Sequence, residues 1–430
     1  MSDRGINRRE LVGGGVAAAG MLALGPEFWE SLARPARRGA GPYGPLGPPD
    51  ANGLRLPAGF SSRVIARGLQ PVGTTGYVWH MFPDGAATYK ASDGGWIMVS
   101  NSELPTPIDL PFDPPIGNPG EGGASAIHFD RDGGIVDAYR ILSDTTSNCA
   151  GGPTPWGTWL SCEETETGQV WECDPAGVAE ARVHPDMGVF SHEAVAVDRR
   201  TGFVYLSEDE GAGCFYRFRP RDRGDLSRGR LEVARLSRGA VEWLAVPDPS
   251  AQSGPTRDQV EGATRFRRGE GVWFDSGIVY LATTSDSKIW AYDARRQRMQ
   301  AIYDPAKVKN PPLTDVDNIT VHRRSGDLYV CEDNGAPDAY DIALITPGGR
   351  RHRRRRTVAR FMKLTGPDHG EPGTDASSEV AGVCFNPRGD RLYFSSQRGL
   401  VTGITYEVSG PFRRLRRRRR RRVSARFARR

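Results

Sequence analysis

Six short segments of the sequence follow one plan, in which an aromatic residue leads, aliphatic or small residues follow and polar residues end the run. They are 96–101, 159–163, 205–209, 280–284, 329–333 and 393–397. Irregular units of about 50–60 residues, each with several short strands, are typical of a β-propeller. The sequence therefore predicts an all-β fold, a propeller of about six blades with long inserted loops. A sandwich or barrel would explain the strands, but not the acidic residues that recur at their ends.

Glycine and proline support a β fold. The chain has 53 glycines and 32 prolines among 430 residues, which favours a turn-rich β protein over a helix bundle. No segment has the periodicity of an amphipathic helix longer than about ten residues. We expect the propeller domain to cover 61–410, after a Pro/Gly-rich linker at 34–60.

Positive charge is concentrated in two arginine-rich segments. Residues 413–430 hold twelve arginines and no acid, so the net charge of +6 becomes −6 without them, and 350–356 hold six more arginines. Such runs can bind nucleic acid by charge alone. They lack interleaved aromatic residues and a folded reading element, so no specific nucleic-acid function is expected. We interpret 411–430 as a disordered tail.

The first 33 residues predict an export signal. Arg8 and Arg9 precede an apolar stretch at 12–24, and Ser-Leu-Ala at 31–33 offers a small-residue cleavage site. Paired arginines before a weakly apolar core are typical of the Tat route, whose export machinery would be a partner. A disordered cytoplasmic N-terminus is the alternative. No stretch approaches 18 apolar residues, so no transmembrane segment is expected. The expected location is the periplasm, cell envelope or extracellular space.

Acidic residues end three of the aromatic-led segments. They are Glu163, Glu164, Glu208, Asp209, Glu332 and Asp333. The innermost strands of a propeller converge on its centre, so carboxylates at these strand ends would face one volume. Converging carboxylates repel one another unless a cation lies between them or some are protonated. The pattern predicts a metal site, with ordinary surface turns as the alternative.

The run 148–164, NCAGGPTPWGTWLSCEE, joins a thiol to two carboxylates. Cys149 lies in a Gly/Pro-rich loop, where a thiolate would be a strong ligand able to bridge two iron-like ions. A buried free cysteine or a disulfide is the alternative, because six cysteines permit up to three disulfides in an exported protein.

Two further segments could serve such a site. Glu193 begins an alternating strand and is a candidate metal ligand. Arg268 and Glu270 stand two residues apart on one face of an extended chain. An arginine near a metal can hold a phosphate through its fork of donors, and a surface ion pair is the alternative.

Other polar segments are less specific. Asp317 and Asn318 suit calcium, but they also suit an ordinary Asx turn. The segments around Asp84 and Glu103 are interpreted as supporting or structural. The sequence has no Walker, GxGxxG, G-x-S-x-G or HExxH motif. With only seven histidines, a His-rich zinc site is not expected.

Taken together, segments spread over about 75–405 resemble the PhoX family of alkaline phosphatases. They are WHMFPDGAATY, GGWIMVSNSE, NCAGGPTPWGTWLSCEE, SHEAVAVD, YLSEDE, FYRFRP, RRGEGVWF, DNITV, LYVCEDN and LYFSSQRG. The resemblance implies a six-bladed propeller that carries a di-iron and calcium cluster, hydrolyses phosphomonoesters and is exported by the Tat route. The chain is shorter than the long members, and Ser102-Glu103 stands where these tend to have His-Glu.

The resemblance also implies roles for individual residues. Cys149 would bridge two Fe³⁺ ions, and Arg268 would contact phosphate. The other implied ligands of iron or calcium are oxygen donors: Glu163, Glu164, Glu193, Glu270, Asp317, Asn318, Glu332 and Asp333. The division of these donors between the ions is open, including which of Glu163 and Glu164 is the ligand.

The leading expectation is an exported, monomeric, metal-dependent phosphatase with Arg268 and Cys149 as catalytic residues. A metal-bound oxo or hydroxide would attack phosphorus, and Arg268 would add charge stabilisation in the transition state. One alternative is a calcium-dependent propeller esterase or lactonase, including phosphotriesterase-like activity, that makes no use of Cys149. Another is a secreted binding propeller without catalysis.

Overall fold

The computed structural model describes residues 35–112, 114, 116–333, 340–347, 356–370, 378–399 and 402–414. Regular structure in these residues is all β apart from five one-turn 3-10 helices, which confirms the predicted class. None of the described helices has the length and hydropathy needed to cross a bilayer. The predicted signal at 1–33, residues 350–355 and the tail residues 415–430 lie outside this description.

Most strands form four-stranded antiparallel meanders in chain order. The first three are β5–β8 (Pro83–Lys90, Trp96–Ser102, Gly123–Phe129, Ile135–Leu142), β9–β12 (Asn148–Pro153, Trp159–Glu163, Val170–Cys173, Arg182–Val183) and β13–β16 (His192–Val197, Val204–Glu208, Phe215–Asp222, Asp225–Ser237). The next two are β18–β21 (Gly269–Asp275, Ile278–Thr283, Lys288–Asp293, Arg298–Tyr303) and β22–β25 (Val316–His322, Asp327–Glu332, Asp341–Ile345, Thr357–Leu364). Between the third and fourth, β17 (Ala240–Ala245) pairs with both β16 and β21, so these two meanders share one nine-stranded sheet.

The last meander joins the two ends of the described chain. It comprises β26 (Val380–Phe385), β27 (Arg391–Ser396) and β28 (Ile404–Ser409), and its fourth strand is β4 (Ser61–Arg67), which pairs antiparallel with β28. Hydrogen bonds between these distant segments close the arrangement of sheets. The predicted tail therefore begins too early, because Phe412 is buried in the core and Arg413 pairs with Asp327.

The segment predicted as a linker is part of the fold. Strands β1 (Arg37–Arg38), β2 (Leu46–Pro49) and β3 (Leu54–Pro57) extend the sheet of β22–β25, with β1 and β3 both paired to β25. This pairing covers an edge whose N–H and C=O groups would otherwise lack partners.

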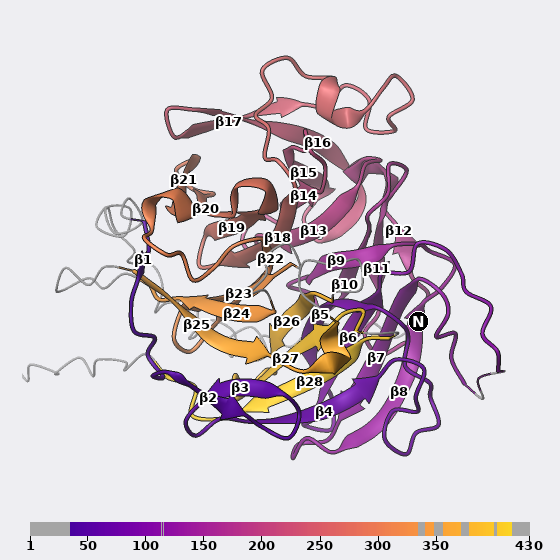
Figure 1. The fold of residues 1–430 in the computed structure, drawn as a ribbon. Helices are drawn as coiled ribbons and strands as arrows, with labels where there is room; N and C mark the ends of the chain where they lie inside the picture. The colour runs from indigo at the N-terminus through magenta and orange to yellow at the C-terminus, as the bar shows by residue number, and fades with distance from the viewer. Residues whose placement is uncertain are drawn as a thin grey trace, which may run out of the picture.

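The first strands of the meanders form a closed ring. Strand β5 packs against β9, and the contacts continue through β13, β18, β22 and β26 back to β5. Figure 1 shows the sheets arranged around this ring. Hydrophobic clusters fill the space between neighbouring sheets; one of them contains Trp96, Phe129 and Tyr393 from the first and last meanders. The leading aromatic residues of the sequence pattern thus pack between sheets.

Small residues allow the ring strands to approach closely. The central cavity is lined at this level by Gly85, Ala150, Ala194, Gly271 and Gly382. At Gly85, an added Cβ would lie 2.5 Å from the Cα of Ala150 and 3.0 Å from the carbonyl oxygen of Cys149. These are backbone atoms of β9, so β5 and β9 would have to separate to admit the Cβ.

We therefore expect Gly85→Ala to lower the free energy of unfolding by about 1–3 kcal/mol, the usual cost of overpacking. Urea unfolding would measure the change. Gly211→Ala is the matched control, because a Cβ at Gly211 meets nothing within 4 Å, and it should stay within about 0.5 kcal/mol of the parent protein. Equal midpoints for the two variants would contradict the close contact of β5 with β9.

Candidate metal centre

Five of the ring strands carry an oxygen or sulfur donor where their register with the next strand shifts. The donors are Asp84 on β5, Cys149 on β9, Glu193 on β13, Glu270 on β18 and Asp317 on β22. Such a shift is a β-bulge, in which two residues oppose one, and bulges near active sites re-aim a side chain. The bulges therefore turn these five side chains toward one end of the ring.

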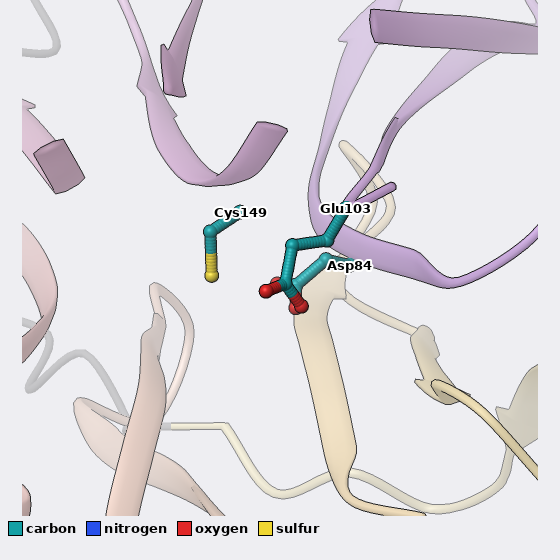
Figure 2. A group of neighbouring side chains, drawn as sticks. All are labelled: Asp84, Glu103 and Cys149. Atoms are coloured by element: carbon teal, nitrogen blue, oxygen red, sulfur yellow. The ribbon is translucent and has the colours of Figure 1, made fainter. Parts of the chain in front are cut away.

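These five donors and two neighbours form three overlapping groups. Asp84, Glu103 and Cys149 form the first group, Cys149, Glu164 and Glu193 the second, and Glu193, Glu270 and Asp317 the third. In each group the three donor atoms lie within 4.8 Å of one another. Figure 2 shows the first group, in which the carboxylates of Asp84 and Glu103 lie together beside the Cys149 side chain. We call the seven residues the donor set.

Burial and mutual repulsion favour the protonated forms of the acids of the donor set. Burial first, and then the charge of Glu103, raise the pKa of Asp84 from 3.8 to about 7. Burial, followed by the charges of neighbouring acids, raises the pKa values of Glu193, Glu270 and Asp317 well above their ordinary values. A cation among these oxygens would favour the ionised forms instead.

Glu193 shows that the donor set fits a metal ion. Its side chain is 0% exposed, and neither carboxylate oxygen has a hydrogen-bond partner among the described residues. Leaving a buried carboxylate without a partner is costly, and buried charges are normally paired or bound to a metal. Because Glu193 belongs to both the second and third groups, a cation in either group would supply the missing partner.

Cys149 lies within strand β9, and not in the loop that the sequence predicts. It is a free, buried thiol, as are the other five cysteines, so none of the disulfides that the sequence permits is formed. Burial, followed by the charges of Asp84 and Glu193, raises the pKa of Cys149 well above its ordinary value. A thiol beside carboxylates loses its proton when a cation binds. Sulfur and oxygen donors together suit iron, whereas oxygen donors alone suit calcium.

Arg268 borders the third group. It binds Asp209 through two parallel contacts, Nε to Oδ1 at 3.1 Å and Nη2 to Oδ2 at 3.0 Å, and its Nη2 lies 3.1 Å from Glu270. Burial alone would lower the pKa of Arg268, but the hydrogen bond to Asp209 and the charges of Glu270, Asp209 and Asp333 raise it. The guanidinium therefore stays charged, and 40% of the side chain is exposed. Its φ of 48° lies in the left-handed region, a costly conformation that clusters at functional sites.

Four predicted ligands have other partners and lie outside the donor set: Glu163, Asn318, Glu332 and Asp333. Glu163 accepts hydrogen bonds from the backbone N–H groups of Thr146 and Gln169, both at 3.2 Å. Glu332 accepts one from the N–H of Thr314 at 2.8 Å.

Asn318 orients its neighbour. Its Nδ2 donates to Asp317 at 2.8 Å, and its Oδ1 accepts from the N–H of Gly382 at 2.6 Å. Asp333 is placed against Arg268, with 3.4 Å between Nη1 and Oδ2. Asn318 and Asp333 therefore support the side chains next to them.

Sequence reasoning missed two members of the donor set. Asp84 and Glu103 had been interpreted as supporting or structural, yet both lie in the first group. One signal could have found Asp84: an acid followed by a small residue, as in Asp84-Gly85, also occurs at Glu193-Ala194 and Glu270-Gly271. Glu103 has no comparable signal, since it follows the end of β6.

Comparisons with known proteins bear on the family and the fold of the chain. The family model for alkaline phosphatase PhoX matches residues 134–171 and 165–399. No curated protein sequence matches the chain significantly. Among solved structures, the fold is similar to that of Pseudomonas fluorescens PhoX in complex with vanadate, a transition state analogue, with a TM-score of 0.67, 17% identity and coverage of 85% of this chain and 97% of that chain.

Other solved structures are less similar. A gluconolactonase from Xanthomonas campestris has a TM-score of 0.43 and 14% identity, covering 86% of this chain and 99% of its own. The PQQ domain of pyranose dehydrogenase from Coprinopsis cinerea has a TM-score of 0.48 and 12% identity, covering 87% and 100%. Both are too distant to carry a functional argument. The family match, in contrast, spans more than half of the sequence, and the chain belongs to the alkaline phosphatase PhoX family of phosphomonoester hydrolases.

Proposed function

We propose that the donor set is the metal centre with which this phosphatase hydrolyses phosphomonoesters. The observation that carries the proposal is Glu193, which is fully buried, has no partner for either carboxylate oxygen among the described residues, and is shared by two groups. Family membership supplies the reaction class, because the matching family is one of alkaline phosphatases.

Donor chemistry divides the proposed centre. The first two groups share the Cys149 sulfur and suit two iron ions, whereas the third group has only carboxylates and suits calcium. When bound, such ions polarise phosphoryl oxygens and lower the pKa of a coordinated water. Glu163, Asn318, Glu332 and Asp333 act from outside the set, by holding its strands and side chains.

Arg268 is the phosphate-binding residue of the proposal. Asp209 fixes one edge of the guanidinium, and the side chain remains 40% exposed beside Glu270. A guanidinium offers five N–H donors. Two bind Asp209, the second N–H of Nη2 faces Glu270 and one N–H of Nη1 faces Asp333, which leaves one Nη1 N–H for a phosphate oxygen. Negative charge on these oxygens is stabilised in the transition state by a fixed cation that needs no rearrangement. Cys149 contributes by holding ions, and no serine nucleophile is needed.

The proposal extends to architecture and location. The closed ring of first strands and the pairing of β4 with β28 support a six-bladed propeller. On the basis of the paired arginines at the N-terminus, we propose that the enzyme is exported by a Tat-type signal at 1–33 and acts outside the cytoplasm. We also propose that it is a monomer.

Turnover of p-nitrophenyl phosphate, combined with elemental analysis, tests the proposal. The purified protein should contain iron and calcium, and Arg268→Ala should lower kcat/KM by about 100-fold while both metals remain, because one fixed donor to the transition state is lost. Arg267→Ala is the matched control, since Arg267 is exposed and its Nε binds the carbonyl of Gly211. A folded, metal-free protein without turnover would overturn the proposal.

A further inference from the structure

The last meander faces the metal centre without supplying a donor from its ring strand. The register of β26 shifts between Ala381 and Cys384, where the chain has no acid. The polypeptide just after β27 instead reaches the first group with two polar side chains, Gln397 and Arg398. Gln397 ends the last of the six aromatic-led segments, 393–397, and Arg398 follows it.

Gln397 connects the two acids of the first group. Its Nε2 donates to Asp84 Oδ2 and to Glu103 Oε2. The side chain is 0% exposed, and its Oε1 has no hydrogen-bond partner among the described residues. The backbone N–H of Gln397 donates to the carbonyl of Glu379 at 3.0 Å, which fixes the start of the side chain.

The unpartnered carbonyl shows what sets the orientation of the amide. When both acids are ionised, as they are with a cation bound, the reverse orientation would bring Oε1 against two carboxylate oxygens with no donor between them. A buried amide with one end unsatisfied is unfavourable and calls for an explanation. The contacts of Nε2 supply it, because each N–H of the amide holds one carboxylate of the first group.

Arg398 fixes Glu103 from a second side. Its Nη2 lies 3.2 Å from Glu103 Oε2, and its Nη1 lies 3.6 Å from Glu379. Glu103 comes from a loop end after β6, whereas Asp84 lies within β5. The two carboxylates therefore depend on side chains from the far end of the sequence to stay together.

We propose that Gln397 is a positioning residue of the metal centre, which holds Asp84 and Glu103 as a pair for the ion of the first group. The inference rests on the proposed metal centre. Residues that hydrogen-bond to metal ligands fix ligand orientation, and their loss commonly costs about 10–100-fold in metal affinity. The last meander thus contributes to the site through the residues just after β27, whereas the other five meanders contribute donors from their ring strands.

Two nearly isosteric substitutions test the inference on the intact, metal-loaded protein. Gln397→Met removes both N–H donors, and Gln397→Glu also adds a third acid to the pair. Iron and calcium per chain would be measured by elemental analysis during titration with EDTA. We expect Gln397→Met to lose one of its ions at an EDTA concentration about 10–100-fold lower than the wild type needs. Gln397→Glu should lose that ion at a lower concentration still. Excess of that ion should restore phosphatase activity, which it would not do for a folding defect.

Gln300→Leu is the matched control, because Gln300 is a half-buried glutamine on β21, outside the donor set. It should retain its ions as the wild type does. Suppose that the wild type binds its ions and that both Gln397 variants lose them at the same EDTA concentration as the wild type. The proposed role of Gln397 is then wrong, while the proposed function stands. A wild-type protein that binds no ion overturns both. Should Gln397→Glu fail to fold, Gln397→Met decides alone.

Discussion

Replacing Cys149 with serine should remove iron from the protein and lower phosphatase turnover by more than about 100-fold, because losing even an outer partner of a metal ligand costs about 10–100-fold. The sulfur of Cys149 is shared by the first and second groups and is the only non-oxygen donor in the set. A serine hydroxyl has nearly the same shape but does not ionise as a thiol does. The variant should therefore fold, but the first and second groups, which share Cys149, should bind their ions weakly.

Cys384→Ser is the matched control for this experiment. Cys384 is also buried, but it lies in the hydrophobic cluster between the first and last meanders. Its replacement should reduce stability while iron and turnover per folded molecule stay at the wild-type level. Wild-type iron content and turnover in Cys149→Ser would instead contradict the role of the thiolate as an iron ligand, as expected for a hydrolase that uses calcium alone.

The donors that the sequence predicted share a local signal. Glu193, Glu270 and Asp317 are each the second residue of a strand, and these strand starts meet at one end of the ring. Cys149 and Glu164 stand in a distinctive run of glycine, proline and tryptophan. Short-range pattern pointed to these residues because the same strand design recurs around the ring.

Other parts of the site depend on geometry that short-range pattern does not encode. Glu163 and Glu164 are adjacent, but successive side chains of an extended chain point to opposite faces, and only Glu164 joins the donor set. The choice depends on the register between β9 and β10, where the bulge lies. Gln397 reaches Asp84 across a separation of 313 residues, so its role follows only from the closure of the ring.

Composition also misled one domain boundary. Residues 34–60 are rich in proline, glycine and arginine, which is typical of a linker, yet Leu54 and Leu56 are buried against the sheet of β22–β25. Two residues of β3 pair with β25, and that strand lies some 300 residues away in sequence. A tertiary partner so distant leaves no mark on local composition.

Removal of the ions should make the stability of the protein fall as pH rises. Burial and neighbouring acids raise the pKa of Asp84 from 3.8 to about 7, and those of Glu193, Glu270 and Asp317 well above their ordinary values. Above about pH 4, the unfolded chain has released protons that the folded apoprotein still holds. Stability decreases with pH wherever the unfolded state binds fewer protons. This contribution is fully present below the unfolded pKa and is lost as pH passes through the folded pKa.

The expected effect is large. For Asp84 alone, the shift corresponds to on the order of 4 kcal/mol, and the other acids add to it in the same direction. In the metal-loaded protein the same carboxylates are ionised and paired with cations, so the fall with pH should disappear and binding should add stability. The difference between loaded and EDTA-treated protein should therefore widen between about pH 5 and about pH 8.

Urea unfolding of both forms at these two pH values measures the difference. Glu193→Gln removes one of the titrating acids, so its EDTA-treated form should lose less stability over the interval than the wild type does. Glu261→Gln is the control, because Glu261 is exposed and outside the donor set, and it should lose as much stability as the wild type. An EDTA-treated protein whose urea midpoint rises with pH would show that the acids ionise without a cation. That outcome would remove the electrostatic reason for a metal at the centre of the ring.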